Sequence, residues 1–565
     1  MSLPPTVTLA DVVRWAGPYL GPDRGVFVLA MIYGSGIALL TLAVPISVQM
    51  LINAVAYTGL PAPLFTLSGV LLFLLLCSAV MGAFRKHLME LFRRRFLARV
   101  VADVTLRAVY AQNPFFDDSR RADLFNRFFD VMTVQKAIPS LLIGLFTIIL
   151  QAGIGFVVTA FYHPFFLAFN LSFVFTLWLI WIMWARGAMR SAVELSHAKY
   201  RLAQWLESIG LSNGFYKSSR HLDFAMDRTE EQTAAYVAAH TRHFRYIFPQ
   251  TVSLLILYAL ASAGLLALGG WLVIQGQLSI GQLVAAELIL SSIFYGASQL
   301  GPYLDSFYDL VAAFEELDMF RQVPQELSGA GESVRRSSTS GALSFASVCA
   351  ANEGATARFD FEIPPHSRLI AGAAPGVSRL FDGLLKRHIR SDSGLITLGG
   401  ADISDLNLYE MRSDVIVLNR PTIVETSIRD YLSLASRERD PVRTIAALKS
   451  VGLAGRLAEL PQGLDTLLSG TGWPLSLAET MSLKLAAALI AQPQILVLSE
   501  LFDMLPVERL RTIFDGLHHE RMTIIYFTSR PADLTLDAYL WLGRGEQRIV
   551  KGRGEFDRLR MEPQQ

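Results

Sequence analysis

Residues 138–185 read IPSLLIGLFTIILQAGIGFVVTAFYHPFFLAFNLSFVFTLWLIWIMWA and contain no Asp, Glu, Lys or Arg. Tyr162 and His163 separate this stretch into two apolar runs. Each run is close to the ~20 residues that an α-helix needs to cross the hydrocarbon core of a bilayer. The stretch therefore predicts two consecutive membrane-spanning helices, at 138–161 and 164–185.

Four further apolar runs of similar length lie in the first 300 residues, at 26–46, 64–84, 252–274 and 280–300. The whole chain is 52% hydrophobic and 18% charged, with a mean hydropathy of +0.38. Soluble domains carry about 25% charged residues. We therefore expect six membrane helices surrounded by membrane lipid.

The connections between the predicted spans alternate in charge. Segments 47–63, 162–163 and 275–279 contain no Lys or Arg, whereas the long segments 85–137 and 186–251 are rich in both. Cytoplasmic loops carry the positive excess. This pattern predicts a multi-pass protein of the plasma membrane (the inner membrane of a bacterium), with both termini and both long loops in the cytoplasm.

The long segment 85–137 has a helical pattern of its own. Apolar residues recur every four positions from Leu88 to Val100, which is the spacing of one helix face. We therefore expect the membrane helices to continue well into the cytoplasm.

Residues 1–25 precede the first predicted span and contain a short amphipathic pattern. Thr8 is placed as an N-cap, and apolar residues follow at near-helical spacing (Leu9, Val12, Val13, Ala16 and Leu20). Two interpretations stay open: a helix that lies on the membrane surface and an ordinary amphipathic helix that packs on the protein.

The second half of the chain has a different pattern. Residues 327–342 are small and polar, which predicts a linker. After it, short β-like runs alternate with helical ones, which favours an α/β domain with a largely parallel sheet. The runs are 367–370, 395–398, 415–418, 495–498 and 523–527. We expect four parts: an N-terminal segment, a six-helix membrane domain, a linker and an α/β domain, at 1–25, 26–326, 327–342 and 343–565.

Charge and cysteine content exclude several kinds of partner. The net charge is +1, so no overall charge attracts nucleic acid. Cys77 and Cys349 are the two cysteines, and they are far apart in sequence. They have no metal-ligand spacing, and we expect no metal site and no nucleic-acid partner.

Six spans followed by an α/β domain resemble the half-transporters of the ABC exporter superfamily, and four stretches of the second half carry the resemblance most specifically. They are similar to the segment after the family's P-loop helix, the stretch after its Q-loop, the segment before its signature motif and its Walker B strand. In this chain they read GLITLGGADI (394–403), TSIRDYL (426–432), LPQGLDT (460–466) and ILVLSE (495–500), and the first cytoplasmic loop adds FFDD (115–118). The resemblance implies a six-helix exporter domain followed by a P-loop-type nucleotide-binding domain of the ABC type.

The resemblance breaks at the residues that hold nucleotide. A P-loop cradles phosphates with backbone N–H groups, a Lys reaches the terminal phosphates, and a Ser or Thr hydroxyl holds magnesium. Here the loop reads GAAPGVSR (372–379). Gly372 matches the first glycine, but Val377 replaces the last one, Ser378 replaces the Lys and Arg379 replaces the magnesium-binding hydroxyl. Pro375 also removes a backbone donor.

The other family positions differ as well. Asn419 stands for the Gln that senses magnesium, Ser499 for the Walker B Asp, and Ser529 for the histidine after the last strand. The signature reads LSLAE (475–479): Ser476 is kept, but Leu477 and Ala478 replace its two glycines, and Glu479 adds a negative charge where phosphate would bind. Among the family's catalytic residues, only the general base has a surviving counterpart, Glu500.

Phosphoryl transfer depends on positioning and on electrostatic stabilisation, and these substitutions remove the main contributors to both. We therefore predict a folded but catalytically silent domain, a pseudo-ATPase. ATP and magnesium are implied by the family only, and we expect that neither is a working cofactor here.

Three functional hypotheses stay open. The chain is a transport subunit that forms a heterodimer with an ATP-competent ABC half, a homodimeric scaffold or regulator of an export assembly, or a divergent ATP-driven exporter of a peptide, protein or lipid-like substrate. The family pairs its nucleotide-binding domains head to tail, so neither composite site would be complete with an active partner. A similarity to type I secretion exporters adds a periplasmic adaptor as a partner.

The spans are nearly free of ionisable residues, and Glu287 in the sixth span is the exception. A carboxylate inside a membrane segment is a candidate for function. Glu287, Gln49 and Asn53 are therefore the predicted residues of a substrate pathway. The alternative for each is a polar residue near a span end that reaches water or a polar neighbour.

Overall fold

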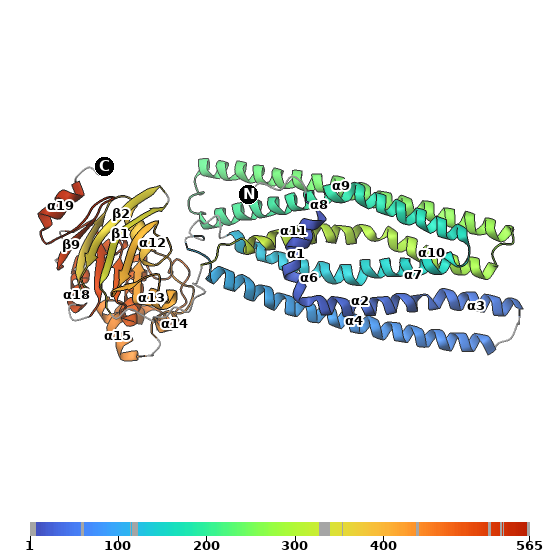
Figure 1. Cartoon of the computed structure of the whole chain (residues 1–565), viewed down its shortest axis with the longest axis horizontal. Helices are drawn as coiled ribbons and strands as arrows, with labels where there is room; N and C mark the ends of the chain where they lie inside the picture. The colour runs from blue at the N-terminus through green and yellow to red at the C-terminus, as the bar shows by residue number, and fades with distance from the viewer. Residues whose placement is uncertain are drawn as a thin grey trace. The chain divides into compact units, whose positions relative to one another are not determined.

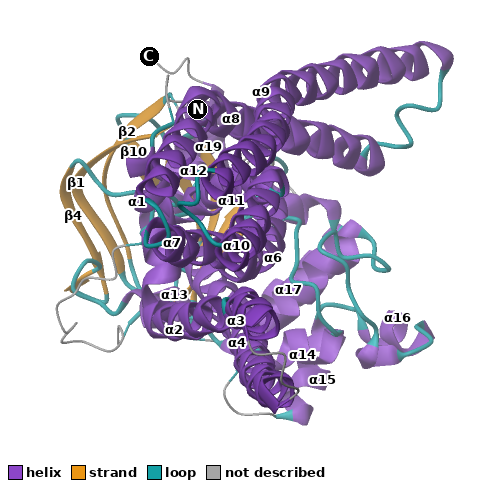
Figure 2. Ribbon diagram, turned by 90° about the vertical axis from the view of Figure 1, so that its right-hand side faces the viewer, coloured by secondary structure: helices purple, strands orange, loops and turns teal. Residues whose placement is uncertain are grey.

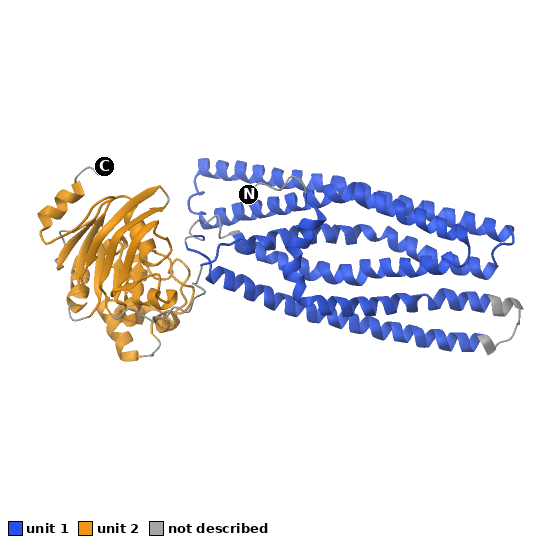
Figure 3. Ribbon diagram, in the orientation of Figure 1, with its two compact units in different colours: residues 1–326 blue, residues 327–565 orange. Residues whose placement is uncertain are grey.

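The computed structural model describes residues 7–57, 62–113, 115, 123–326, 340–352, 354–436, 440–517, 521–531, 534 and 536–561, without the side chains of 53–57, 62–63 and 123. The chain divides into two compact units, unit 1 at Met1–Glu326 and unit 2 at Leu327–Gln565 (Figure 3). Most of the predicted linker 327–342, and residues 116–118 of the FFDD stretch, lie outside the described residues.

Unit 1 is helical (Figure 1). Its main helices are α1 (Leu9–Leu20), α2 (Arg24–Thr41), α3 (Ala43–Tyr57), α4 (Ala62–Val109), α6 (Asp130–Ser140), α7 (Phe146–Ala160), α8 (Pro164–Leu211), α9 (Ser219–Ile274), α10 (Ile280–Ser298) and α11 (Leu300–Arg321). The 3-10 helix η3 (Asp123–Phe129) precedes α6, and the π-helix η4 (Leu141–Leu145) joins α6 to α7. Six helical segments of the described chain are long and apolar enough to cross a membrane, which confirms the predicted number of spans.

Three of the spanning helices are much longer than a bilayer requires. Helices α4 and α8 have 48 residues each and α9 has 56. At 1.5 Å per residue they measure about 70–85 Å, more than twice the ~30 Å hydrocarbon core. These lengths are as great as helices that continue well into the cytoplasm require, while the side of the membrane stays a prediction. Helices α8 and α9 run side by side (Figures 1 and 2).

Helix α1 packs on the protein. Thr8 caps it as predicted, in a capping box with Asp11. Trp15 and Tyr19 are buried; the Tyr19 hydroxyl donates to the Leu317 carbonyl of α11 at 2.7 Å. Leu9 is 46% exposed and Val13 is 70% exposed, so the predicted apolar stripe was wrong at these two residues. These contacts support the packed-helix interpretation.

Unit 2 contains two sheets (Figure 2). One is antiparallel, with the strand order β2-β1-β4-β5. The other has the order β10-β9-β3-β8-β7-β6, and only its β9–β10 pair is antiparallel. The strands are β1 (Leu343–Asn352), β2 (Ala355–Ile363), β3 (Arg368–Ala373), β4 (Ser393–Leu398), β5 (Ala401–Asp402), β6 (Val415–Leu418), β7 (Ile495–Leu498), β8 (Thr523–Phe527), β9 (Ala538–Leu542) and β10 (Gln547–Val550).

Helices connect these strands. They are α12 (Val377–Leu385), α13 (Leu408–Asp414), α14 (Ile428–Ser433), α15 (Pro441–Ser450), α16 (Ala454–Glu459), α17 (Leu477–Ala491), α18 (Val507–Gly516) and α19 (Arg553–Met561), with the 3-10 helix η6 (Glu500–Met504) after β7. All five predicted β-runs are strands, and the largely parallel sheet is confirmed. The run 395–398 belongs to the antiparallel sheet instead, because β4 pairs with β1 and β5.

Candidate functional site

The P-loop position lies between β3 and α12. Gly372 is near the end of β3, and Gly376 precedes α12 with φ +84°, a conformation that favours glycine. Val377 is the first residue of α12. A strand, a short loop and a helix N-terminus therefore stand in the order that phosphate binding requires.

The backbone N–H groups of this loop already have partners. The Ala374 N–H donates to the Leu542 carbonyl at 2.9 Å, and the Val377 N–H donates to the Ala374 carbonyl at 3.0 Å. Pro375, between them, has no N–H. Three of the loop positions that could contact phosphate through a backbone N–H, at 374, 375 and 377, are therefore unavailable in this conformation.

The side chains of the loop take part in packing. A Cβ at Gly372 would lie 2.9 Å from Phe556 Cζ and 3.4 Å from Trp541, so close packing alone explains this glycine. Val377 is fully buried in the core of unit 2. Ser378 is half-buried and Arg379 is exposed. The position of the phosphate-binding Lys therefore has no cation, and the adjacent one has a solvent-facing guanidinium.

Asn419 follows β6 and contacts the helix after the P-loop position. Its Nδ2 donates to Asp382 Oδ2 of α12 at 2.8 Å, while Asp382 Oδ1 is buried and has no hydrogen-bond partner. Burial raises the pKa of Asp382 to about 7, against the opposing effect of the Asn419 hydrogen bond. The Asn419 side chain, at the position of the family's magnesium-sensing Gln, is thus hydrogen-bonded to Asp382 of the same domain.

The signature position is closed by a capping box. The Ser476 hydroxyl accepts from the Glu479 N–H at 3.3 Å, and Glu479 Oε2 accepts from the Ser476 N–H at 2.7 Å. Arg456 Nε lies 3.2 Å from Glu479 Oε1. The helix N-terminus of α17 therefore has a carboxylate where nucleotide phosphate would bind, and Leu477, 41% exposed, stands beside it.

The ends of β7 and β8 are joined through Asp503, which the sequence analysis missed. The carboxylate of Asp503 accepts hydrogen bonds from Tyr526 (2.5 Å), Thr528 (2.6 Å), and both the N–H (2.8 Å) and the hydroxyl (2.6 Å) of Ser529. Burial raises the pKa of Asp503, but these hydrogen bonds outweigh it and leave the pKa below its ordinary value. Ser529, which replaces the family's histidine after the last strand, is thus fixed by its hydrogen bonds to Asp503.

The two residues after β7 behave differently from each other. Ser499 caps η6, and its hydroxyl accepts from the Leu501 N–H at 3.4 Å. Glu500 is exposed, and within the described part of the chain its carboxylate has no hydrogen-bond or ion-pair partner.

The predicted substrate-pathway residues lie on α3 and α10 of unit 1. Glu287 of α10 accepts from the Ser291 hydroxyl at 2.8 Å, and its Oε2 is buried without a partner. Gln49 of α3 accepts from the Tyr162 hydroxyl at 2.7 Å. Asn53 is in α3, but its side chain lies outside the described residues. Among the described side chains, Glu287 and Gln49 form hydrogen bonds with different partners and not with each other.

Only one group of side chains among the described residues has the geometry of a metal site. It consists of His197, Glu315 and Glu316, all in unit 1. The described residues of the nucleotide positions in unit 2 include no comparable group.

Comparison with known proteins finds a family model that matches part of the membrane half. Residues 27–208 match the ABC transporter transmembrane region. Similar curated proteins include the uncharacterized ABC transporter ATP-binding protein YknU of Bacillus subtilis, 26% identical over 42% of this chain and 41% of the relative. The cyclolysin secretion/processing ATP-binding protein CyaB of Bordetella pertussis is 23% identical over 51% of this chain and 42% of the relative. The ATP-dependent lipid A-core flippase of Desulfotalea psychrophila is 22% identical over 54% of each chain.

The fold has a close match among solved structures. A bacterial Atm1-family ABC exporter with ATP bound superposes with a TM-score of 0.79 at 17% identity, over 96% of both chains. The matches to the three curated relatives above span about half of each relative's length or less. The chain is thus a multi-pass membrane protein with the fold of an ABC exporter half-transporter, which confirms the resemblance and the fold class.

Proposed function

We propose that this chain is an exporter-type membrane subunit whose nucleotide-binding domain is catalytically silent. One observation carries the proposal: at four of the positions that would hold nucleotide, hydrogen bonds within the chain itself engage the groups that would contact it. Loop N–H groups bond to Leu542 and Ala374, Asn419 to Asp382, Ser476 to Glu479, and Ser529 to Asp503.

ATP would have to displace these contacts and gain little in return. A hydrogen bond within a folded protein contributes about 1 kcal/mol, and an unpaired buried donor or acceptor costs about 1–3 kcal/mol. Catalysis also needs cations and metal ligands at the phosphates, and each is worth several kcal/mol of transition-state stabilisation. Ser378 and Ser499 supply neither a cation nor a carboxylate.

In this proposal the chain serves an export system in one of two ways. As a heterodimer with an ATP-competent ABC half it completes a transport pathway, and as a homodimer it is a scaffold or regulator. The names of two relatives, for cyclolysin secretion and for lipid A-core flipping, support a protein, peptide or lipid-like cargo. Unit 2 faces the cytoplasm from the inner membrane, and a periplasmic adaptor is the further partner.

Glu500 favours a second candidate function, a divergent ATP-driven exporter. Its carboxylate is exposed and without a partner in the described chain, so it could accept a proton from an attacking water molecule as a general base does.

The deciding experiment is nucleotide binding by the purified full-length protein in lipid nanodiscs, at millimolar ATP with and without magnesium. We expect no saturable binding, with an ATP-hydrolysing ABC exporter as the positive control and a cooperative unfolding transition as proof of folding. Saturable, magnesium-dependent binding would contradict the proposal, and loss of hydrolysis in Glu500→Gln would then establish the divergent exporter.

A further inference from the structure

We propose that His197, Glu315 and Glu316 form a site for a divalent transition metal, with Zn²⁺ as the best-suited ion, that links α8 to α11 within unit 1. The site is independent of the nucleotide positions and of the proposed silent domain.

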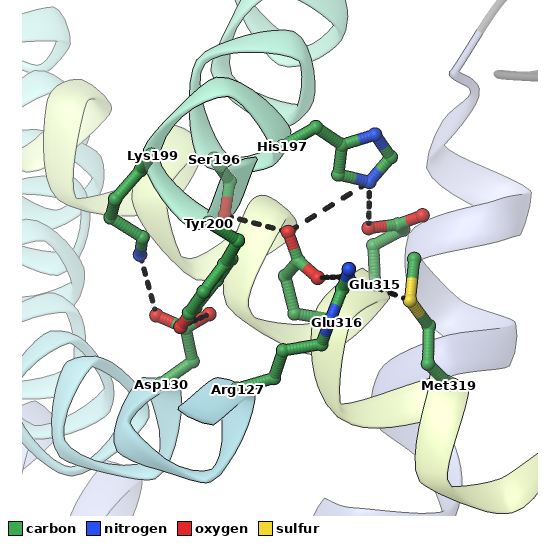
Figure 4. A network of polar contacts seen from close by, with 9 residues as sticks. All are labelled: Arg127, Asp130, Ser196, His197, Lys199, Tyr200, Glu315, Glu316 and Met319. Carbon is green, nitrogen blue, oxygen red and sulfur yellow. Dashed lines mark hydrogen bonds and ion pairs between the residues drawn. The ribbon is translucent and has the colours of Figure 1, made fainter. Parts of the chain in front are cut away.

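The three candidate ligand atoms converge (Figure 4). His197 Nε2 lies 3.0 Å from Glu315 Oε2 and 3.8 Å from Glu316 Oε1, and all three atoms are within 4.8 Å of one another. Tetrahedral Zn²⁺ binds His nitrogen and carboxylate oxygen at about 2.0–2.2 Å, which places its ligands roughly 3.4 Å apart. The two distances from His197 Nε2 lie on either side of that value, and the Glu315 and Glu316 oxygens lie within 4.8 Å of each other, so side-chain adjustment would bring the three ligands around an ion.

Further contacts hold Glu316 in place. The Ser196 hydroxyl donates to Glu316 Oε1 at 2.9 Å, and Arg127 donates to Glu316 Oε2. Glu316 is fully buried. Metal-binding carboxylates are typically oriented by such hydrogen bonds from outer partners. Arg127 and Ser196 thus direct the Oε1 atom of Glu316 to the side on which His197 lies.

The charges of the cluster favour a cation. Glu315 and Glu316 contribute two negative charges, and Arg127 compensates one. Lys199 does not supply the second, because its Nζ pairs with Asp130 Oδ1 at 3.1 Å, and Asp130 also accepts from Tyr200. One negative charge therefore remains, either for a metal ion beside neutral His197 or for protonated His197 itself.

The site is also open enough for an ion to enter. The side chains of His197 and Glu315 are 15% and 13% exposed. Water can therefore reach their side of the cluster and complete the coordination as a fourth ligand, as in zinc sites with three protein ligands.

A bound ion would connect helices that are distant in sequence. Residues 197 and 315 are separated by 118 positions, and α11 is the last helix of unit 1 before the chain continues into unit 2. An ion that binds only the folded arrangement stabilises it in proportion to the logarithm of its concentration over Kd. The metal would therefore act as a clip between α8 and α11.

Cobalt titration of the full-length protein, stripped of metals with a chelator, tests the proposal. We expect one Co²⁺ per chain with the visible absorption of tetrahedral coordination, displaced by Zn²⁺, and a rise in the unfolding temperature with Zn²⁺. His197→Gln and Glu315→Gln should each weaken Co²⁺ binding by about 10–100-fold or more. His240→Gln, an exposed histidine of α9, should bind Co²⁺ like the unaltered chain.

Two results would overturn the proposal. One is the absence of tetrahedral Co²⁺ absorption in the folded, unaltered protein, and the other is equal Co²⁺ affinity in Glu315→Gln. The Glu315 variant keeps a polar partner for His197, so its folding is expected to survive. Co²⁺ affinity that does not rise as the pH rises through the range in which histidine side chains lose their proton would also contradict a metal site, because metal binding needs neutral histidine.

Discussion

Val377 shows at the scale of a single residue how the P-loop position has become part of the core. Its side chain is fully buried in the same apolar cluster as Leu380 and Phe381. A phosphate-binding loop uses glycine where the backbone must approach the ligand closely. In this chain the valine stabilises the start of α12 by packing.

Restoring the family residue should therefore destabilise the protein. Val377→Gly removes buried methyl groups, leaves a cavity and frees the backbone at the first helical position, with an expected loss of about 2–4 kcal/mol. Unfolding of the full-length protein, followed by intrinsic fluorescence, measures the change. Ser378→Ala, at a half-buried neighbour, is the control with a much smaller effect. Unchanged stability of Val377→Gly would contradict the packing role.

Asp382 predicts a pH dependence of stability. Burial raises its pKa to about 7 in the folded protein, so the folded state binds a proton more tightly than the unfolded state. The stabilising contribution of this proton is complete below about pH 4 and is lost as the pH rises through about 7. Asp382→Asn should therefore be more stable than the unaltered chain at pH 8, by about 1–3 kcal/mol.

The stability difference between Asp382→Asn and the unaltered chain should disappear toward pH 4. Unfolding of both proteins, measured between pH 4 and 8, checks this pH dependence. Asp392→Asn, at an exposed carboxylate, serves as the control with a flat difference across the range. If Asp382→Asn is equally stable relative to the parent at both ends, Asp382 is ionised in the folded state and its proposed environment is wrong.

At the scale of elements, α17 has a capping box at the signature position. Ser476→Ala removes the hydroxyl that accepts from the Glu479 N–H and should cost about 1 kcal/mol. The same loss is expected with and without millimolar ATP and magnesium, because the serine acts on the helix and not on a nucleotide. Ser450→Ala, exposed near the end of α15, should stay within about 0.5 kcal/mol. An ATP-dependent difference for Ser476→Ala would support nucleotide binding instead.

The elements also show which parts of the fold the sequence could predict. Strands β7 and β8 are buried on both faces, so they appear as continuous apolar runs and were predicted with their bounds. Strands β1 and β2 escaped prediction because buried and exposed residues mix along them, with a register shift near Phe345. Strand β9 is apolar throughout, so its signal was present and was overlooked.

For the nucleotide positions too, some features could be predicted from the sequence and others could not. The positions of Asn419, Ser499 and Ser529 could be assigned because each lies within two residues of the end of a predictable strand. The partners of Asn419 and Ser529 could not be predicted, because Asp382 and Asp503 lie in other elements, and the Asn419–Asp382 contact spans 37 positions. The His197–Glu315 contact, across 118 positions, is beyond any local pattern for the same reason.

At the scale of the whole molecule, the distribution of charge predicts how the chain is inserted. The turn between α9 and α10 contains Gln277 and no Lys or Arg, whereas Asn213 lies between α8 and α9 in the basic segment. Helix α9 separates the two by 56 residues, about 84 Å. The positive-inside rule therefore predicts that Gln277 faces the periplasm and Asn213 the cytoplasm.

Labelling of single cysteines with a membrane-impermeant maleimide tests this orientation, in a chain with Cys77 and Cys349 replaced by alanine. Gln277→Cys should react in cells with a permeable outer membrane and an intact inner one. Asn213→Cys and Lys551→Cys, both exposed, should react only after the inner membrane is opened. Lys551 matters most, because it reports on unit 2. If Lys551→Cys is labelled from outside, unit 2 has no access to cytoplasmic ATP. The absence of nucleotide-binding residues in unit 2 would then be explained by its location, and not by a role beside an ATP-competent partner.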